Sequence, residues 1–308
     1  MTDISAIEFV EVGPRDGLQN EPVLIKTVDK LDLIERAIAA GIKRIEVASF
    51  VNPKKVPQMA DAEAVCGGLT PYTDVTYIGL VLNQRGAERA LAAQGVNQLG
   101  AVCVATDSFA MANQGQSSDD SVAIAKEIIT SARQSGKTAQ VTIAASFGCP
   151  FEGEVDERRV IDMAANLAQA GPCEIALADT IGVANPAHVA RLVSAVSVAI
   201  APLPVRVHFH NTRGTGLANV WAAIGAGAHI IDGSIGGLGG CPFAPGAAGN
   251  VATEDVIYML ERAGIATGLD LDKLIETAGW LSAKMGKNMP SMLSKAGGFP
   301  KAKPAKAA

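Results

Sequence analysis

Short apolar runs recur along the chain, and amphipathic segments lie between them. Each run is rich in Val, Ile and Ala, which is typical of strands buried on both faces, as in a parallel sheet. Eight runs predict strands: Ile7–Gly13, Ile42–Phe50, Thr73–Leu82, Asn97–Thr106, Ala139–Phe147, Glu174–Thr180, Val205–His210 and His229–Ile235. Strands that alternate with helices imply right-handed βαβ units, and eight such units favour closure over an open sheet. The pattern therefore predicts an α/β protein built as a (β/α)8 TIM barrel.

The segments between these runs carry the signals of helices. Apolar residues at i, i+3 and i+7 precede Gly41, which is suited to follow the end of a helix. Pro186 stands where a first helical turn would begin. A third segment has its apolar residues at helical spacing before Gly227: Leu217, Val220, Trp221 and Ile224.

One further amphipathic helix is predicted beyond the eighth strand. Its apolar positions are Leu271, Leu274, Ile275, Ala278 and Leu281. We expect residues 1–285 to form a catalytic barrel that includes this extra C-terminal helical segment. The tail, residues 286–308, ends in KAGGFPKAKPAKAA, and its low apolar content predicts partial disorder.

Composition narrows the class of protein. The chain has 308 residues, of which 48% are hydrophobic and 19% are charged, so it can bury one large core. Its net charge of −5 argues against a nucleic-acid partner. No apolar run reaches the roughly 18 residues of a membrane span. The start, MTDISAIEFVEVG, has no basic or Arg-rich leader, so we expect a cytoplasmic protein. The five cysteines form no CxxC pair and predict neither a disulfide framework nor a thiolate zinc site.

Polar residues that can do chemistry stand at the ends of the predicted strands. In a barrel of this type, the active site lies where the carboxyl ends of the strands meet. The candidates are Arg15 and Asp16 after the first strand, Glu46 in the second, Asp179 at the end of the sixth, His208 and His210 in the seventh, and Cys241 and Asn250 after the eighth.

His208 and His210 form an alternating pair in a strand. Side chains two apart point to the same face, so both imidazoles can face the barrel interior and share one cation. Two satisfied core histidines are the alternative, but the polar HNTRG turn beside them favours a metal site. Asp16 would add an anionic ligand. Imidazole and oxygen ligands with open positions suit Mg²⁺ or Mn²⁺ and, less exclusively, Zn²⁺.

Three charged candidates have a structural and a chemical interpretation. Arg15 could form a surface ion pair, or it could hold a carboxylate or polarise a carbonyl as it becomes an enolate. Glu46 lies in an apolar strand and is costly to bury unpaired, so we expect it to hold Arg15 or a metal ligand in place. Asp179 could cap the following turn or contact the substrate or the metal.

The segment GGLGGCPFAPGAAGN is dense in glycine and could make a flexible lid. It is not a dinucleotide fingerprint, because Pro242 stands where that pattern requires glycine. Gly136-Lys137-Thr138 is not a P-loop either, since Ser131 replaces the required glycine and the triplet precedes a strand.

Six runs in one order resemble the hydroxymethylglutaryl-CoA lyase family over nearly the whole barrel. They are VGPRDGLQNEP, IEVASFVNPKKVPQMAD, FGCPFEG, ADTIGVANP, VHFHNTRGTGLAN and GGLGGCPFAPGAAGNVATEDVIYML. The resemblance implies a divalent-metal-dependent retro-Claisen cleavage of 3-hydroxy-3-methylglutaryl-CoA to acetyl-CoA and acetoacetate. It also implies an acyl-CoA partner, a role in leucine degradation, and a homodimer or larger homo-oligomer.

The resemblance also implies residue roles. The cation would be surrounded by Asp16, His208, His210 and Asn250. Arg15 would polarise the thioester carbonyl, with Glu46 as its support. Asp179 would lie near metal and substrate, His208 or Asp16 would be the base, and Cys241 would be the active-site thiol.

Two departures from the family pattern bear on the acyl group. The family commonly reads HxHDTYGQ after the seventh strand, where this chain has Asn211 and Arg213, and Thr142 stands about where familiar members carry an aromatic residue. We expect these positions near the acyl-binding end, and we expect Gln19, Thr142 and Asn211 among the substrate-binding residues.

Three alternatives follow from the sequence. The first is a lyase for a related acyl-CoA, either citramalyl-CoA or a longer 3-substituted 3-hydroxyglutaryl-CoA. The second is a condensing synthase that resembles isopropylmalate synthase, but such enzymes lack the GGLGGCP run and carry a regulatory extension. The third is a non-catalytic barrel that serves as a binding or scaffold protein. The loss of any one of the candidate catalytic residues would have supported it, but all are present: Arg15, Asp16, His208, His210 and Cys241.

Overall fold

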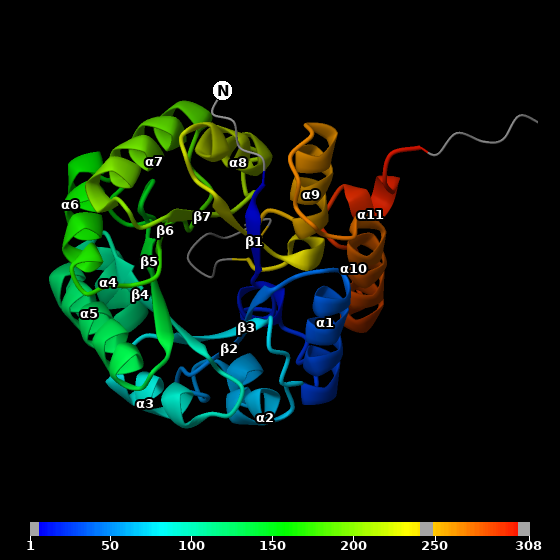
Figure 1. Cartoon of the computed structure of the whole chain (residues 1–308), viewed down its shortest axis with the longest axis horizontal. Coiled ribbons are helices and arrows are strands. Elements are labelled where there is room, and N and C mark those ends of the chain that lie inside the picture. Colours follow the sequence, from blue (N-terminus) through cyan, green and yellow to red (C-terminus); the bar gives the residue numbers. More distant parts are fainter. Residues whose placement is uncertain (1–5, 241–248, 301–308) are drawn as a thin grey trace, which may run out of the picture.

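Eight parallel strands form a closed barrel in chain order in the computed structural model, which describes residues 6–240 and 249–300 (Figure 1). The strands are β1 Glu8–Glu11, β2 Arg44–Ser49, β3 Thr76–Val81, β4 Gln98–Val104, β5 Thr138–Ala144, β6 Ile175–Asp179, β7 Val205–Phe209 and β8 Ile230–Gly233. Every predicted strand is confirmed, and so is the (β/α)8 barrel. All eight predicted runs are longer than the strands because they include residues of the adjoining loops.

Helices surround the strands (Figure 1). They are α1 Thr27–Ala39, α2 Ala62–Gly67, α3 Gln84–Ala92, α4 Asp107–Gln114, α5 Ser118–Gln134, α6 Glu157–Ala168, α7 Pro186–Ile200, α8 Gly216–Gly225, α9 Thr253–Arg262, α10 Leu271–Met285 and α11 Leu293–Ala296. Three short turns are η1 Gly13–Gly17, η2 Pro57–Met59 and η3 Ile235–Gly237. None of the helices within residues 6–240 and 249–300 is both long and apolar enough to cross a membrane.

The helix signals in the sequence are confirmed with one difference. Gly41 follows the end of α1 with φ +100°, and Pro186 is the first residue of α7. In α8, Val220 and Ile224 are buried, but Trp221 is 44% exposed, so it does not belong to the buried face. A position next to the apolar stripe satisfies the same spacing and can still point to solvent.

The predicted extra helix is α10, which packs against α1 and α9 (Figure 1). The chain beyond it is also held to the barrel. The carboxylate of Asp255 in α9 accepts hydrogen bonds from the backbone N–H groups of Met292 (2.9 Å) and Leu293 (2.8 Å). The domain boundary at residue 285 and the disorder of the tail stay predictions, and residues 301–308 lie outside the described part of the chain.

The barrel interior has an apolar part and a charged part. The apolar cluster consists of Val10, Val12, Ile78 and Ile230. Beside it, four buried charged side chains from β2, β7 and β8 and from the residue before β6 form a continuous chain of ion pairs: Arg44, Glu174, Arg206 and Asp232. We call these four residues the buried ion-pair column. Buried charges are tolerated when each has a partner of good geometry, and every member of the column has one.

Two buried carboxylates fasten the turns that follow β1 and β8. Glu11 accepts hydrogen bonds from the N–H groups of Gly13 (2.8 Å) and Ile235 (2.9 Å) and from the hydroxyl of Thr253 (2.6 Å). A Cβ at Gly13 would overlap with the Glu11 carboxylate, so the start of η1 requires glycine. Glu254 accepts from the N–H of Gly236. Glu11 therefore fixes both turns to β1, and Glu254 fixes η3 to α9.

These carboxylates predict a pH dependence of stability. Burial raises the pKa of Glu11 to about 8 and that of Glu254 to about 7, against an ordinary value of 4.5. The folded protein therefore holds these protons more tightly than the unfolded chain. Their contribution is fully present below the ordinary value and is lost as pH rises through about 7 to 8.

We expect the Tm to fall from about pH 5 to about pH 9, and Glu11→Gln to reduce that fall because position 11 no longer ionises. Thermal unfolding followed by circular dichroism across this range measures both slopes. Equal slopes in the two proteins would contradict the assignment to Glu11.

Candidate active site

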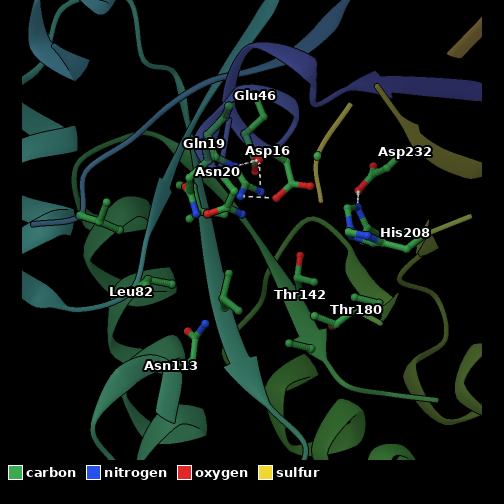
Figure 2. Close-up of a pocket in the computed structure, with 18 of the residues that line it drawn as sticks. Asp16, Gln19, Asn20, Glu46, Leu82, Asn113, Thr142, Thr180, His208 and Asp232 are labelled. Atoms are coloured by element: carbon green, nitrogen blue, oxygen red, sulfur yellow. Dashed lines mark hydrogen bonds and ion pairs between the residues drawn. The ribbon is translucent and has the colours of Figure 1, made fainter. Parts of the chain in front are cut away.

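A cavity opens where the carboxyl ends of the strands meet (Figure 2). Seven of the residues that the sequence nominates line it: Arg15, Asp16, Gln19, Glu46, Thr142, His208 and His210. An apolar wall stands among the other lining residues and includes Leu80, Leu82, Val102 and Phe109. The cavity thus combines charged groups with apolar surface, as sites for small organic ligands do.

The turn η1 places Arg15 and Asp16 at the cavity. The carbonyl of Val12 accepts hydrogen bonds from three successive N–H groups, those of Arg15 (3.2 Å), Asp16 (2.7 Å) and Gly17 (3.1 Å). This widened π-type turn is short and fully hydrogen-bonded, a geometry often found at functional sites. The two charged side chains are therefore held by the backbone at the end of β1.

Arg15 lies between two carboxylates. Its guanidinium forms an ion pair with Asp16 Oδ1 at 2.6 Å and another with Glu46 Oε1. Burial favours the neutral form of Asp16, but the Arg15 guanidinium and the nearby His208 hold the pKa of that carboxyl at about 2. Burial also raises the pKa of Glu46, against the effect of Arg15. Glu46 thus makes the contact with Arg15 that its buried position predicts.

Asp16, His208 and His210 converge. One ligand atom from each lies within 4.8 Å of the others, and the two imidazole ring centroids are 5.2 Å apart. Burial, together with the neighbouring His208, lowers the pKa of His210 to about 4, so this imidazole is neutral near pH 7 and can bind a metal. Three converging ligands of this kind can hold a divalent cation.

Two buried atoms beside this cluster support a cation. Within the described residues, His210 Nδ1 and Asn250 Oδ1 are buried and have no hydrogen-bond partner. The Asn250 amide nitrogen donates to Asp16 Oδ2 (2.7 Å) and to the Leu238 carbonyl (2.9 Å). Gly239 packs so closely against this amide that a Cβ would overlap with it. One unpaired acceptor belongs to His210 of the cluster and the other to Asn250, whose amide contacts Asp16, so the residues present fit a metal.

Asp232 and Arg206 also line the cavity, although neither was predicted from the sequence. Asp232 Oδ2 lies 3.3 Å from His208 Nδ1, and Arg206 forms an ion pair with Asp232 at 2.6 Å. The signal was available: Asp232 is an acid in the apolar run HIIDGSI, as Glu46 is in its own strand. A buried acid predicts a buried partner, and Arg206 is that partner.

Asp179 and Asn211 do not line the cavity. The Asp179 carboxylate accepts hydrogen bonds from the N–H groups of Val183 (2.9 Å) and Ala184 (3.0 Å). These contacts agree with the interpretation that Asp179 caps the following turn. Asn211 accepts from the N–H of Gly216 (3.0 Å) at the start of α8. Roles for Asp179 and Asn211 in substrate binding stay predictions that these contacts do not support.

Arg213 does not line the cavity. Its guanidinium donates to the backbone carbonyls of Ile181 and Gly182. These carbonyls hold the side chain in the loop after β6. Of the three residues that depart from the family pattern, therefore, only Thr142 lines the cavity.

The predicted active-site thiol, Cys241, lies outside the described residues. The other four cysteines are free thiols. Cys149 is buried, and the hydroxyl of Thr106 donates to its sulfur (3.1 Å). Burial raises the pKa of Cys66 and Cys103 to about 12, so these thiols are unreactive at neutral pH.

Comparison with known proteins agrees with this geometry. The HMGL-like family model matches residues 6–280. The chain belongs to the HMGL-like family. The family resemblance predicted from the sequence motifs is thereby confirmed.

Relatives of this HMGL-like chain are named as lyases of more than one acyl-CoA. It is 44% identical over 285 residues to a hydroxymethylglutaryl-CoA lyase of Bacillus subtilis, which covers 92% of this chain and 95% of the relative. It is 41% identical to the (R)-citramalyl-CoA lyase of Chloroflexus aurantiacus, over 96% of each chain. A solved HMG-CoA lyase of Acinetobacter baumannii, in complex with coenzyme A and 3-methylmalate, is 44% identical, with a TM-score of 0.93 over 99% of each chain.

The cluster predicts that His210→Ala abolishes tight binding of Mn²⁺ without unfolding the barrel, because one ligand is lost from a site fixed by the backbone. Calorimetric titration with Mn²⁺ and circular dichroism measure the two effects. His229→Ala is the matched control, since His229 is exposed and outside the cluster. Unchanged Mn²⁺ affinity in His210→Ala would remove His210 from the ligand set.

Proposed function

We propose that this chain is a carbon–carbon lyase that cleaves 3-hydroxy-3-methylglutaryl-CoA to acetyl-CoA and acetoacetate with the help of a divalent cation. The observation that supports this most is the convergence of Asp16, His208 and His210 beside Arg15 in one cavity. Relatives over nearly the full length are named as lyases of this substrate.

The cation would be held by Asp16, His208, His210 and Asn250. Hard oxygen ligands and imidazoles, without thiolates, favour Mg²⁺ or Mn²⁺ and also admit Zn²⁺. When bound, it would act as a Lewis acid that makes the substrate's 3-hydroxyl more acidic.

The reaction needs one base and one proton donor. The base removes the 3-hydroxyl proton, the oxygen forms the new ketone, and the C2–C3 bond breaks so that its electron pair forms the thioester enolate. A proton then reaches C2 to complete acetyl-CoA. We assign this last proton to Cys241, because a free thiol with a pKa of about 8.5 is mostly protonated at neutral pH.

The base is His208 or Asp16. His208 has a raised pKa: burial alone would lower it, but Asp232 and Asp16 stabilise the charged ring. Its Nδ1 faces Asp232, so it offers only Nε2 to the cavity. A nitrogen that holds the cation cannot also take the proton, which leaves Asp16 as the other candidate base.

Arg15 is suited to the enolate. Its guanidinium is fixed by two carboxylates at the cavity wall and needs no reorientation when negative charge develops on the thioester oxygen. Gln19 and Thr142 line the same cavity and would contact the substrate. Asp179 and Asn211 would act indirectly, through the loops that they hold.

We predict that Arg15→Gln lowers kcat by about 10²–10⁴-fold with a small effect on KM, as expected when a group acts mainly on the transition state. Steady-state kinetics of acetyl-CoA release measure the two constants. A rise confined to KM would show that Arg15 only anchors the substrate.

A second candidate is a lyase for citramalyl-CoA or for a longer 3-substituted 3-hydroxyglutaryl-CoA. Two observations favour it: the similarity to the citramalyl-CoA lyase, and Thr142 at the cavity where familiar members carry an aromatic residue.

A panel of acyl-CoA thioesters tests the proposed function. We expect 3-hydroxy-3-methylglutaryl-CoA to give the highest kcat/KM and chelation to abolish the activity, with Mg²⁺ or Mn²⁺ restoring it. A higher kcat/KM for citramalyl-CoA would favour the second candidate. Full activity in the metal-stripped protein would overturn the mechanism.

Location in the cytoplasm and assembly as a homodimer or larger homo-oligomer stay predictions from the sequence. Light scattering of the purified protein would measure the assembly.

A further inference from the structure

Figure 2 shows Asp232 of β8 beside His208, with a dashed line between the two side chains. Its Oδ2 is 3.3 Å from His208 Nδ1, and the side chain is buried. Both carboxylate oxygens also accept from Arg206 Nη1, at 2.6 and 2.7 Å. Asp232 therefore stands between a cavity imidazole and a buried guanidinium.

Arg206 is held on its other sides. Its Nε lies 2.8 Å from Glu174 Oε1, and its Nη2 donates to Gln140 Oε1 and to the Thr142 hydroxyl (3.2 Å). Glu174 in turn forms two hydrogen bonds with Arg44, at 2.8 and 2.9 Å. A planar guanidinium fixed from several directions leaves Asp232 a single orientation.

This orientation decides which nitrogen of His208 is available. An imidazole that faces a carboxylate through one nitrogen carries its proton there and presents a lone pair on the other. With Nδ1–H directed at Asp232, the lone pair of Nε2 is left for the cavity.

We propose that Asp232 and Arg206 are positioning residues that fix the ring and tautomer of His208 for a divalent cation. The inference rests on the proposed metal site.

The apolar part of the barrel argues against a purely structural ion pair. Val10, Ile78 and Ile230 pack in the same interior, so apolar side chains fit there. Replacing a buried ion pair with apolar residues of similar volume is often neutral or stabilising. The stability of the barrel therefore does not require charges at 206 and 232, whereas orientation of a metal-binding imidazole does.

The test is Mn²⁺ affinity, measured by calorimetry on the purified, metal-free protein. Asp232→Asn keeps the shape of the side chain and removes its charge, and we expect Mn²⁺ to bind about 10–100-fold more weakly. Asp255→Asn is the matched control: it makes the same change in a buried carboxylate that binds the backbone of Met292 and Leu293, outside the buried ion-pair column. We expect it to lower the Tm and leave Mn²⁺ affinity near that of the unsubstituted protein. Equal affinities in both variants overturn the proposal.

Two further measurements test the proposal even if Asp232→Asn fails to fold. The double substitution Arg206→Met, Asp232→Leu fills the space without charge and should fold, yet bind Mn²⁺ as weakly as Asp232→Asn. In the unsubstituted Mg²⁺-loaded protein, ¹⁵N NMR should place the His208 proton on Nδ1. A proton on Nε2, or full Mn²⁺ affinity in the double variant, overturns the proposal.

These outcomes are distinct from failure of the proposed function. If the unsubstituted protein binds no Mn²⁺ and still cleaves 3-hydroxy-3-methylglutaryl-CoA to acetyl-CoA and acetoacetate in the presence of a chelator, the metal-dependent lyase mechanism fails. If it binds Mn²⁺ and Asp232→Asn binds it equally well, only the positioning role fails.

Discussion

The buried ion-pair column is the constraint on which the rest of the site depends. Removing a charged side chain from water costs several kcal/mol, and only close, well-oriented partners offset that cost. The partners come from different strands, since Arg44 lies in β2, Arg206 in β7 and Asp232 in β8, while Glu174 directly precedes β6. Only closure of the barrel brings them together, so the same closure that buries the apolar core also completes the polar network under the cavity.

The turns above the column are equally fixed. Glu11 and Glu254 satisfy backbone N–H groups of η1 and η3, and Asn250 joins the strand-7 side to the loop after β8 by a β-bridge with His210. Arg15 and Asp16 therefore gain their positions from the backbone instead of from long flexible side chains. When the residues that support a site are already held in place, substrate binding costs little conformational entropy, because few side chains remain to be ordered.

Local patterns in the sequence were enough to predict the barrel and much of the site. Strand and helix periodicity reflects which face is buried, and the end of a strand is where a barrel presents its chemistry. Arg15, Asp16, His208 and His210 followed from that rule. Asn211 did not, because the path of a loop after the strand decides whether a side chain enters the cavity, and here the Asn211 oxygen binds the start of α8. Asp232 was a visible signal, but its partner is distant in sequence and becomes apparent only once β7 and β8 lie side by side.

The chain after α10 packs against η3, the turn that follows β8. Ser291 donates its N–H to the carbonyl of Gly236, and Met289 packs so tightly on that glycine that a Cβ there would come within 2.7 Å of the sulfur. Met289 and Gly236 thus pack as one unit. Met289 lies near the end of the chain, whereas Gly236 lies in η3. In a chimera between two members of the family, a crossover between these positions would combine Gly236 from one parent with residue 289 from the other. Residues 236–296 should therefore be exchanged as one block.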